Sequence, residues 1–176
     1  MQHTSITSVL GFWLFCLPGC TVGPDSNPCF DAAPWAVIGT GESEWVDLNS
    51  GDAVTMVHGP QGGWHILGSA KAGNMGQLVS IHYTIHDVAS GERIANNTYT
   101  LALKMDDECS GHFPGMYAYL NVSTLKTGDR DTPPELLAYN DLELTMDITN
   151  EYGMSISETI QVIAVPDPQD IEESRQ

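Results

Sequence analysis

Residues 56–65 read Met-Val-His-Gly-Pro-Gln-Gly-Gly-Trp-His, and this stretch decides how the surrounding chain folds. Proline restricts its own φ and glycine adopts positive φ at little cost, so residues 59–63 are expected to form a loop. Apolar side chains recur at alternate positions before and after this loop, which is typical of strands with one buried face. The stretch therefore predicts a β-hairpin.

The register of this hairpin decides what its two histidines can do. If His58 lies opposite Trp64, a five-residue loop joins the strands, their apolar faces coincide, and His65 points to the other face. A six-residue loop would instead place His58 opposite His65, close enough to share a metal ion. The apolar pattern favours the first register, because a slip of one residue turns every side chain to the opposite face.

The chain begins with the features of an export signal. An apolar run from Val9 to Leu17 is too short to span a bilayer. The sequence Leu-Pro-Gly-Cys at 17–20 resembles the lipobox of bacterial lipoproteins, in which the cysteine is lipidated and becomes the mature N-terminus. This resemblance implies that residues 1–19 are removed and that Cys20 carries the lipid. Pro18 and the lack of Lys or Arg in residues 1–8 depart from the pattern, which leaves an ordinary signal peptide as the alternative.

The same resemblance implies a location in the cell envelope. The residue after the cysteine is Thr21 and not the Asp that commonly retains such proteins in the inner membrane. We therefore expect an outer-membrane lipid anchor, with the folded part in the periplasm or exposed at the cell surface. The expected partners are the membrane, through the lipid, and an envelope protein or other ligand.

The composition divides the remaining chain into one domain and two flanking segments. Residues 20–34 contain three prolines and one glycine, with Asp, Ser and Asn among them, so we expect a flexible tether. Residues 167–176 are polar and acidic, so we expect a disordered tail. Residues 35–166 then form a single domain, long enough for one hydrophobic core.

The cysteines predict one disulfide. Cys16 would leave with the signal and Cys20 would carry lipid, so Cys29 and Cys109 remain to pair. Two free thiols are the alternative, and an oxidising compartment disfavours them.

The body of the domain is expected to be all β, as an antiparallel β-sandwich. Short alternating or β-branched runs are separated by Gly and Pro turn signals, and no segment has helical periodicity. The clearest expected strands are 78–88, 98–105, 117–125, 142–149 and 156–165.

Two further resemblances refine this prediction. The alternating run from Leu142 to Ile148, the turn at 150–153 and the strand after it resemble the last hairpin of immunoglobulin-like domains. The His-Gly-Pro-Gln-Gly-Gly-Trp-His segment, with Gly-Thr-Gly-Glu at 39–42, resembles a group of uncharacterised bacterial lipoproteins from predatory and social soil or marine bacteria. These resemblances imply an immunoglobulin-like sandwich on a lipid anchor, and they imply nothing about mechanism.

A copper- or zinc-binding protein is the main alternative function. Its candidate ligands are His58, His65 and Met56, because imidazole suits both metals and a thioether suits Cu(I). His82 and His86 have a spacing that binds zinc on a helix. In a strand, with a rise of about 3.3 Å per residue, their side chains lie roughly 13 Å apart and cannot share an ion.

Composition also excludes some partners and gives no sign of catalysis. The net charge of −17 disfavours nucleic acid and anionic lipid as ligands. The chain contains no Gly-x-Ser-x-Gly, no His-Glu-x-x-His and no phosphate-binding loop. We therefore expect a non-enzymatic binding module without a required cofactor, with His58, Gln61, Trp64 and His65 as candidate binding residues. The tryptophans and tyrosines could form a sugar-binding face, although aromatic residues in strands are usually core.

Overall fold

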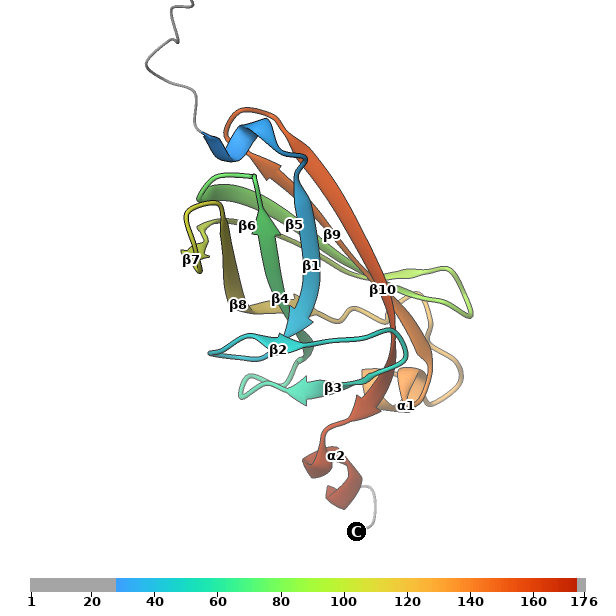
Figure 1. Cartoon of the computed structure of the whole chain (residues 1–176). Helices are drawn as coiled ribbons and strands as arrows, with labels where there is room; N and C mark the ends of the chain where they lie inside the picture. The colour runs from blue at the N-terminus through green and yellow to red at the C-terminus, as the bar shows by residue number, and fades with distance from the viewer. Residues whose placement is uncertain (1–27, 174–176) are drawn as a thin grey trace, which may run out of the picture.

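The computed structural model describes residues 28–173, which form an all-β fold, as predicted (Figure 1). The strands are β1 Trp35–Thr40, β2 Val46–Asp47, β3 Ala53–His58, β4 Trp64–Gly73, β5 Leu78–Asp87, β6 Arg93–Ala102, β7 Lys104–Met105, β8 Ser110–Tyr119, β9 Asp141–Asn150 and β10 Ser155–Pro166. The short helices are the 3₁₀ turn η1 Pro28–Asp31, α1 Pro133–Leu137 and α2 Pro168–Glu173. The expected export signal and Cys20, the expected lipid acceptor, lie outside the described residues.

The strands form one continuous ladder that folds back on itself. One half has β1 paired with β2 and β4, and β4 paired in turn with β8, which also holds β7. The other half has the order β3-β10-β9-β5-β6. Strand β3 joins the halves, because residues 53–56 pair with β10 and residues 57–58 pair with β4.

The expectation of a strictly antiparallel sandwich is wrong at this junction. Strands β3 and β10 run parallel, while the other named strand pairs are antiparallel. Two strands joined by a short hairpin must be antiparallel, whereas strands far apart in the chain can meet in either direction. About a hundred residues separate β3 from β10, so no local sequence pattern specified their relative direction.

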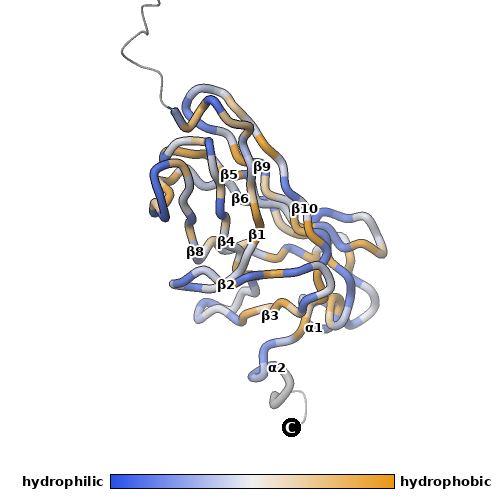
Figure 2. Tube along the Cα trace, viewed as in Figure 1, coloured by the Kyte–Doolittle hydropathy of each residue, from blue (hydrophilic) through white to orange (hydrophobic). Residues whose placement is uncertain are grey.

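Alternation along the long strands builds the core between the two halves. On β5, Val79, Ile81, Tyr83 and Ile85 are buried, and β9 contributes Leu142, Leu144, Met146 and Ile148 to the same cluster. Figure 2 shows hydropathy changing repeatedly along these strands, not in long blocks. Burial of one face therefore sets which side of each strand carries the polar residues.

Small residues on β4 allow close packing on both of its faces. A Cβ atom on Gly73 would lie 2.2 Å from the ring of Trp35, and one on Gly68 would lie 2.5 Å from the ring of Tyr83. Both glycines are thus required by the approach of a neighbouring aromatic ring. Trp35 and Trp45, two of the tryptophans considered for a sugar-binding face, have a packing role here, since Trp45 covers Gly39 in the same way.

The predicted disulfide between Cys29 and Cys109 is present, with 5.1 Å between the Cα atoms. It fixes η1 against the start of β8, and the Asn74 side chain donates to the Ala33 carbonyl (2.8 Å). The expectation of a flexible tether over residues 20–34 is therefore wrong for residues 28–34, because a covalent bond and a long-range hydrogen bond hold them. Residues 20–27 lie outside the described part of the chain.

The expected disordered tail is also wrong for residues 167–173. These residues continue from β10 into α2, whose contacts are described with the site below. Within residues 28–173, no helix is long and apolar enough to cross a membrane.

The disulfide closes a loop with a sequence separation of 80 residues, so its removal should destabilise the fold. We expect the Cys29→Ser, Cys109→Ser double variant to lose up to about 4 kcal/mol of unfolding free energy, because the open chain gains loop entropy. Urea denaturation of the two proteins measures the difference. A loss below about 1 kcal/mol would contradict the constraint.

Candidate functional site

The hairpin between β3 and β4 has the predicted register and the predicted five-residue loop. Val57 pairs with His65, and His58 pairs with Trp64. The Gly59 N–H donates to the Gly63 carbonyl (2.7 Å) and closes the loop. The Gly62 N–H donates to the Gly59 carbonyl (3.0 Å), and Gly62 has a φ of 83°, which favours glycine.

One face of the hairpin holds the C-terminal helix. The rings of His58 and Trp64 stack with 4.5 Å between their centroids. The carboxylate of Asp170, on α2, accepts from the Trp64 indole N–H (2.9 Å) and lies 3.1 Å from His58 Nδ1. A single side chain therefore ties α2 to both rings, which explains why the acidic segment is ordered.

The other face carries an aromatic cluster. The His65 ring lies edge-on to Tyr117, with 4.6 Å between centroids, and Tyr119 pairs with His65 across the β4–β8 ladder. The rings of Tyr117 and Tyr119 are nearly parallel, at 17° and 6.1 Å. Burial lowers the pKa of His65, an effect that the Glu42 carboxylate partly opposes, so His65 is neutral at pH 7.

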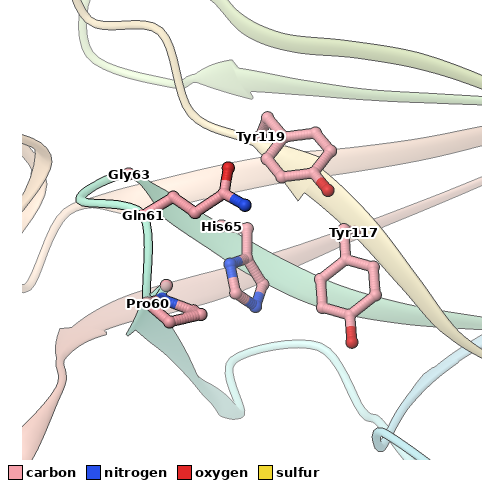
Figure 3. Close-up of a pocket in the computed structure, with 7 residues that line it drawn as sticks. Pro60, Gln61, Gly63, His65, Tyr117 and Tyr119 are labelled. Atoms are coloured by element: carbon pink, nitrogen blue, oxygen red, sulfur yellow. The ribbon is translucent and has the colours of Figure 1, made fainter.

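A groove of about 490 Å³ opens between the 59–63 loop and this cluster (Figure 3). His65 forms its floor, and the Gln61 side chain extends from the loop toward the side occupied by Tyr119. Tyr119 has 59% of its surface exposed, which is unusual for a large aromatic residue in a strand. The residues that line the groove are Gly59, Pro60, Gln61, Gly63, His65, Tyr117 and Tyr119.

A second groove, of about 340 Å³, begins on the other side of Tyr119. It runs along β6 and the segment that follows β8, and three of its lining residues are asparagines. The residues that line it are Arg93, Ile94, Ala95, Asn96, Asn97, Tyr119 and Asn121. Because Tyr119 lines both grooves, they form one continuous surface that we call the Tyr119 surface.

Side chains of β6 hold the edge of β8 beneath this surface. The Tyr117 N–H donates to the Tyr99 hydroxyl (3.0 Å), and that hydroxyl donates to the Tyr117 carbonyl. The Tyr119 N–H donates to the Asn97 side-chain oxygen (3.1 Å). The Asn121 N–H donates to the Ile94 carbonyl (2.7 Å). Along this contact between β6 and β8, which we call the seam, the backbone N–H groups of Tyr117, Tyr119 and Asn121 therefore already donate to protein acceptors.

The structure separates the four candidate binding residues into two pairs. Gln61 and His65 line the groove, whereas His58 and Trp64 face the opposite way and hold α2. The two histidines therefore do not converge on one ion, and Met56 is completely buried. Among the described residues, no group of three or more His, Cys, Asp and Glu side chains could hold a metal. The copper or zinc hypothesis thus has no assembled ligand set in residues 28–173.

Tyr117 and Tyr119 are the site residues that sequence analysis missed. Their spacing with Ala118 between them is the signal that was available, because residues at i and i+2 of a strand share a face. We predicted a strand at 117–125, but β8 begins at Ser110 and ends at Tyr119. The two tyrosines consequently lie at the end of a strand, beside the hairpin.

Comparison with known proteins gives no family assignment. No family model matches the chain, and no curated protein sequence matches it. Among solved structures, the CooA pilin subunit from enterotoxigenic Escherichia coli overlaps with 12% sequence identity and a TM-score of 0.33. The match covers 75% of this chain and 99% of the pilin chain.

The loop geometry predicts unequal effects for two adjacent glycines. Gly62 has a positive φ, while a Cβ on Gly63 would meet nothing within 4 Å and Gly63 has no such φ. We expect Gly62→Ala to lower the unfolding free energy by about 1 kcal/mol, because a Cβ strains the left-handed region. Gly63→Ala, the matched control, should change it by less than about 0.5 kcal/mol. Chemical denaturation measures both, and equal effects would contradict the loop geometry.

Proposed function

We propose that this protein is a lipid-anchored, non-enzymatic binding module of the bacterial envelope, and that the Tyr119 surface holds its ligand. The observation that carries the proposal is the preformed groove beside the 59–63 loop, with an exposed aromatic ring at its rim. Ligand sites are typically concave, mostly apolar and furnished with a few placed polar groups. The lipobox-like segment and the disulfide support an exported, oxidising location.

The chemistry of the groove favours binding over catalysis. Of the residues that line it, His65 is the one side chain with an ordinary pKa near neutrality. A catalytic histidine usually works with a nucleophile and with a group that orients its ring. Within residues 28–173, the lining includes no Ser, Thr, Cys, Asp or Glu to take either role.

The groove is rigid because each of its walls is braced. The loop is closed by the Gly59–Gly63 hydrogen bond, and α2 holds the opposite face of the hairpin through Asp170. Tyr99 and Asn97 fix the backbone of the tyrosine wall. A preorganised site loses less conformational entropy on binding, so more of the contact energy appears as affinity.

The groove lies far from the N-terminal end of the described residues. The Cys29–Cys109 disulfide lies near the end of β4 that pairs Gly73 with Trp35 and Ser110. The groove lies at the other end of β4, eight residues away at His65, a separation of roughly 26 Å at 3.3 Å per residue. Figure 1 shows η1 and the β3–β4 hairpin at opposite ends of the molecule.

The anchor is tested by replacing the proposed lipid acceptor. In cells fed with labelled fatty acid, the wild-type chain should incorporate label and fractionate with membranes. Cys20→Ser should lose the label and appear in the soluble fraction, because the lipid on the Cys20 thiol is the proposed attachment to the membrane. Continued labelling and membrane retention of Cys20→Ser would refute the lipid anchor.

The binding role is tested with the soluble Cys20→Ser protein and washed, sedimentable envelope fragments from the producing cell. We expect the protein to co-sediment, and the added change Tyr119→Ala to reduce the bound fraction several-fold because it removes the exposed ring. Tyr139→Ala is the matched control, since Tyr139 is 70% exposed and lines neither groove. Equal retention of all three proteins, or none for the parent, would refute a binding role for this surface.

A further inference from the structure

We infer that the ligand of the Tyr119 surface is an uncharged saccharide chain, laid across both grooves with a sugar ring on Tyr119. This inference rests on the proposed function and names the chemical class of its ligand. Three independent features carry it: the charge of the surface, the arrangement of its aromatic rings, and the orientation of its amide groups.

The surface is nearly uncharged within a very acidic protein. The chain has 23 acidic and six basic residues, yet no Asp, Glu or Lys is among the described residues that line the two grooves. Arg93 is the one charged residue of the lining, and His65 is neutral because burial lowers its pKa. A site for a cation would need acidic ligands, and a strongly anionic ligand would be repelled by the net charge of −17. The lining therefore fits an uncharged ligand.

The aromatic rings form a platform suited to a sugar face. Tyr117 and Tyr119 come from alternate positions of β8, and their nearly parallel rings stand 6.1 Å apart. A pyranose ring presents C–H groups on its faces and hydroxyl groups around its rim. Such a ring can rest its apolar face on a phenol ring while the rim reaches polar groups on each side. Tyr119 is placed for this contact, because grooves open on both of its sides.

The amides beside the platform are oriented as donors. The Asn97 side-chain oxygen accepts from the Tyr119 N–H, and the Asn121 oxygen accepts from the Ser123 N–H (3.1 Å). Both oxygens are thus engaged, and no hydrogen bond within the described residues uses the NH₂ groups of Asn97 and Asn121. With Arg93 and Gln61, they offer donors to the hydroxyl oxygens of a sugar.

The same seam argues against a peptide that would bind as an added strand. Strand addition needs a free backbone edge with unpaired N–H and C=O groups. Here the N–H groups of Tyr117, Tyr119 and Asn121 all donate to protein acceptors. The surface offers side-chain donors and ring faces, which is what a saccharide uses.

Affinity gel electrophoresis tests the inference with defined probes. The soluble Cys20→Ser protein is run in native gels containing amylose, laminarin, xylan, galactomannan or dextran, with hyaluronan and chitosan as charged comparisons. We expect retardation by at least one neutral polymer. Tyr119→Ala should weaken that affinity about tenfold or more, which corresponds to about 1.4 kcal/mol. Tyr119→Phe, which keeps the ring face, should stay within about threefold of the parent.

Two further variants keep the test independent of folding. Gln61→Ala changes an exposed loop side chain that makes no protein hydrogen bond, and should weaken binding about threefold. Tyr139→Ala, on an exposed position outside the grooves, should leave the gel shift unchanged. Retardation by no neutral polymer, by charged polymers only, or equally in Tyr119→Ala would overturn the inference. If the envelope fragments still bind in a Tyr119-dependent way, the binding function stands and only the saccharide class fails.

Discussion

The register that pairs Val57 with His65 is the constraint on which the rest of the site depends. A slip of one residue would exchange the two faces of β4 and bring His65 to the face that now holds α2. The loop enforces the register through the left-handed Gly62 and the Gly59–Gly63 hydrogen bond. One face of the hairpin can therefore serve as a structural brace while the other remains available to a ligand.

The junction of the two sheet halves supplies the second wall of the site. Because β3 leaves β4 after two residue pairs and joins β10, the ladder curves around the core instead of ending as a flat sheet. This curvature brings β6 beside β8, where Tyr99 and Asn97 bond to the β8 backbone through their side chains. The polar side chains thus take the place of a regular strand pairing. The half-buried Tyr117 and the exposed Tyr119 lie together at this contact between β6 and β8.

Both ends of the described chain are fastened, and by different chemistry. At the N-terminal end, the disulfide of Cys29 holds η1 covalently. At the C-terminal end, Asp170 on α2 accepts a hydrogen bond from the Trp64 indole and lies 3.1 Å from His58 Nδ1. The first attachment holds the start of the described chain beside the start of β8. The second links the last helix to the hairpin that carries the groove, so the ordering of α2 and the rigidity of the loop are coupled.

The sequence by itself determined the all-β class, the hairpin and its register, and the pairing of Cys29 with Cys109. These features follow from local rules: alternation over neighbouring positions, the φ preferences of glycine and proline, and the number of cysteines left to pair. It also indicated Gln61 and His65, because they belong to that hairpin. Only the tertiary structure decided the parallel contact of β3 with β10, the docking of α2 and the meeting of β4, β6 and β8. Each of those depends on which distant strands become neighbours, and alternation is the same whichever neighbour a strand acquires.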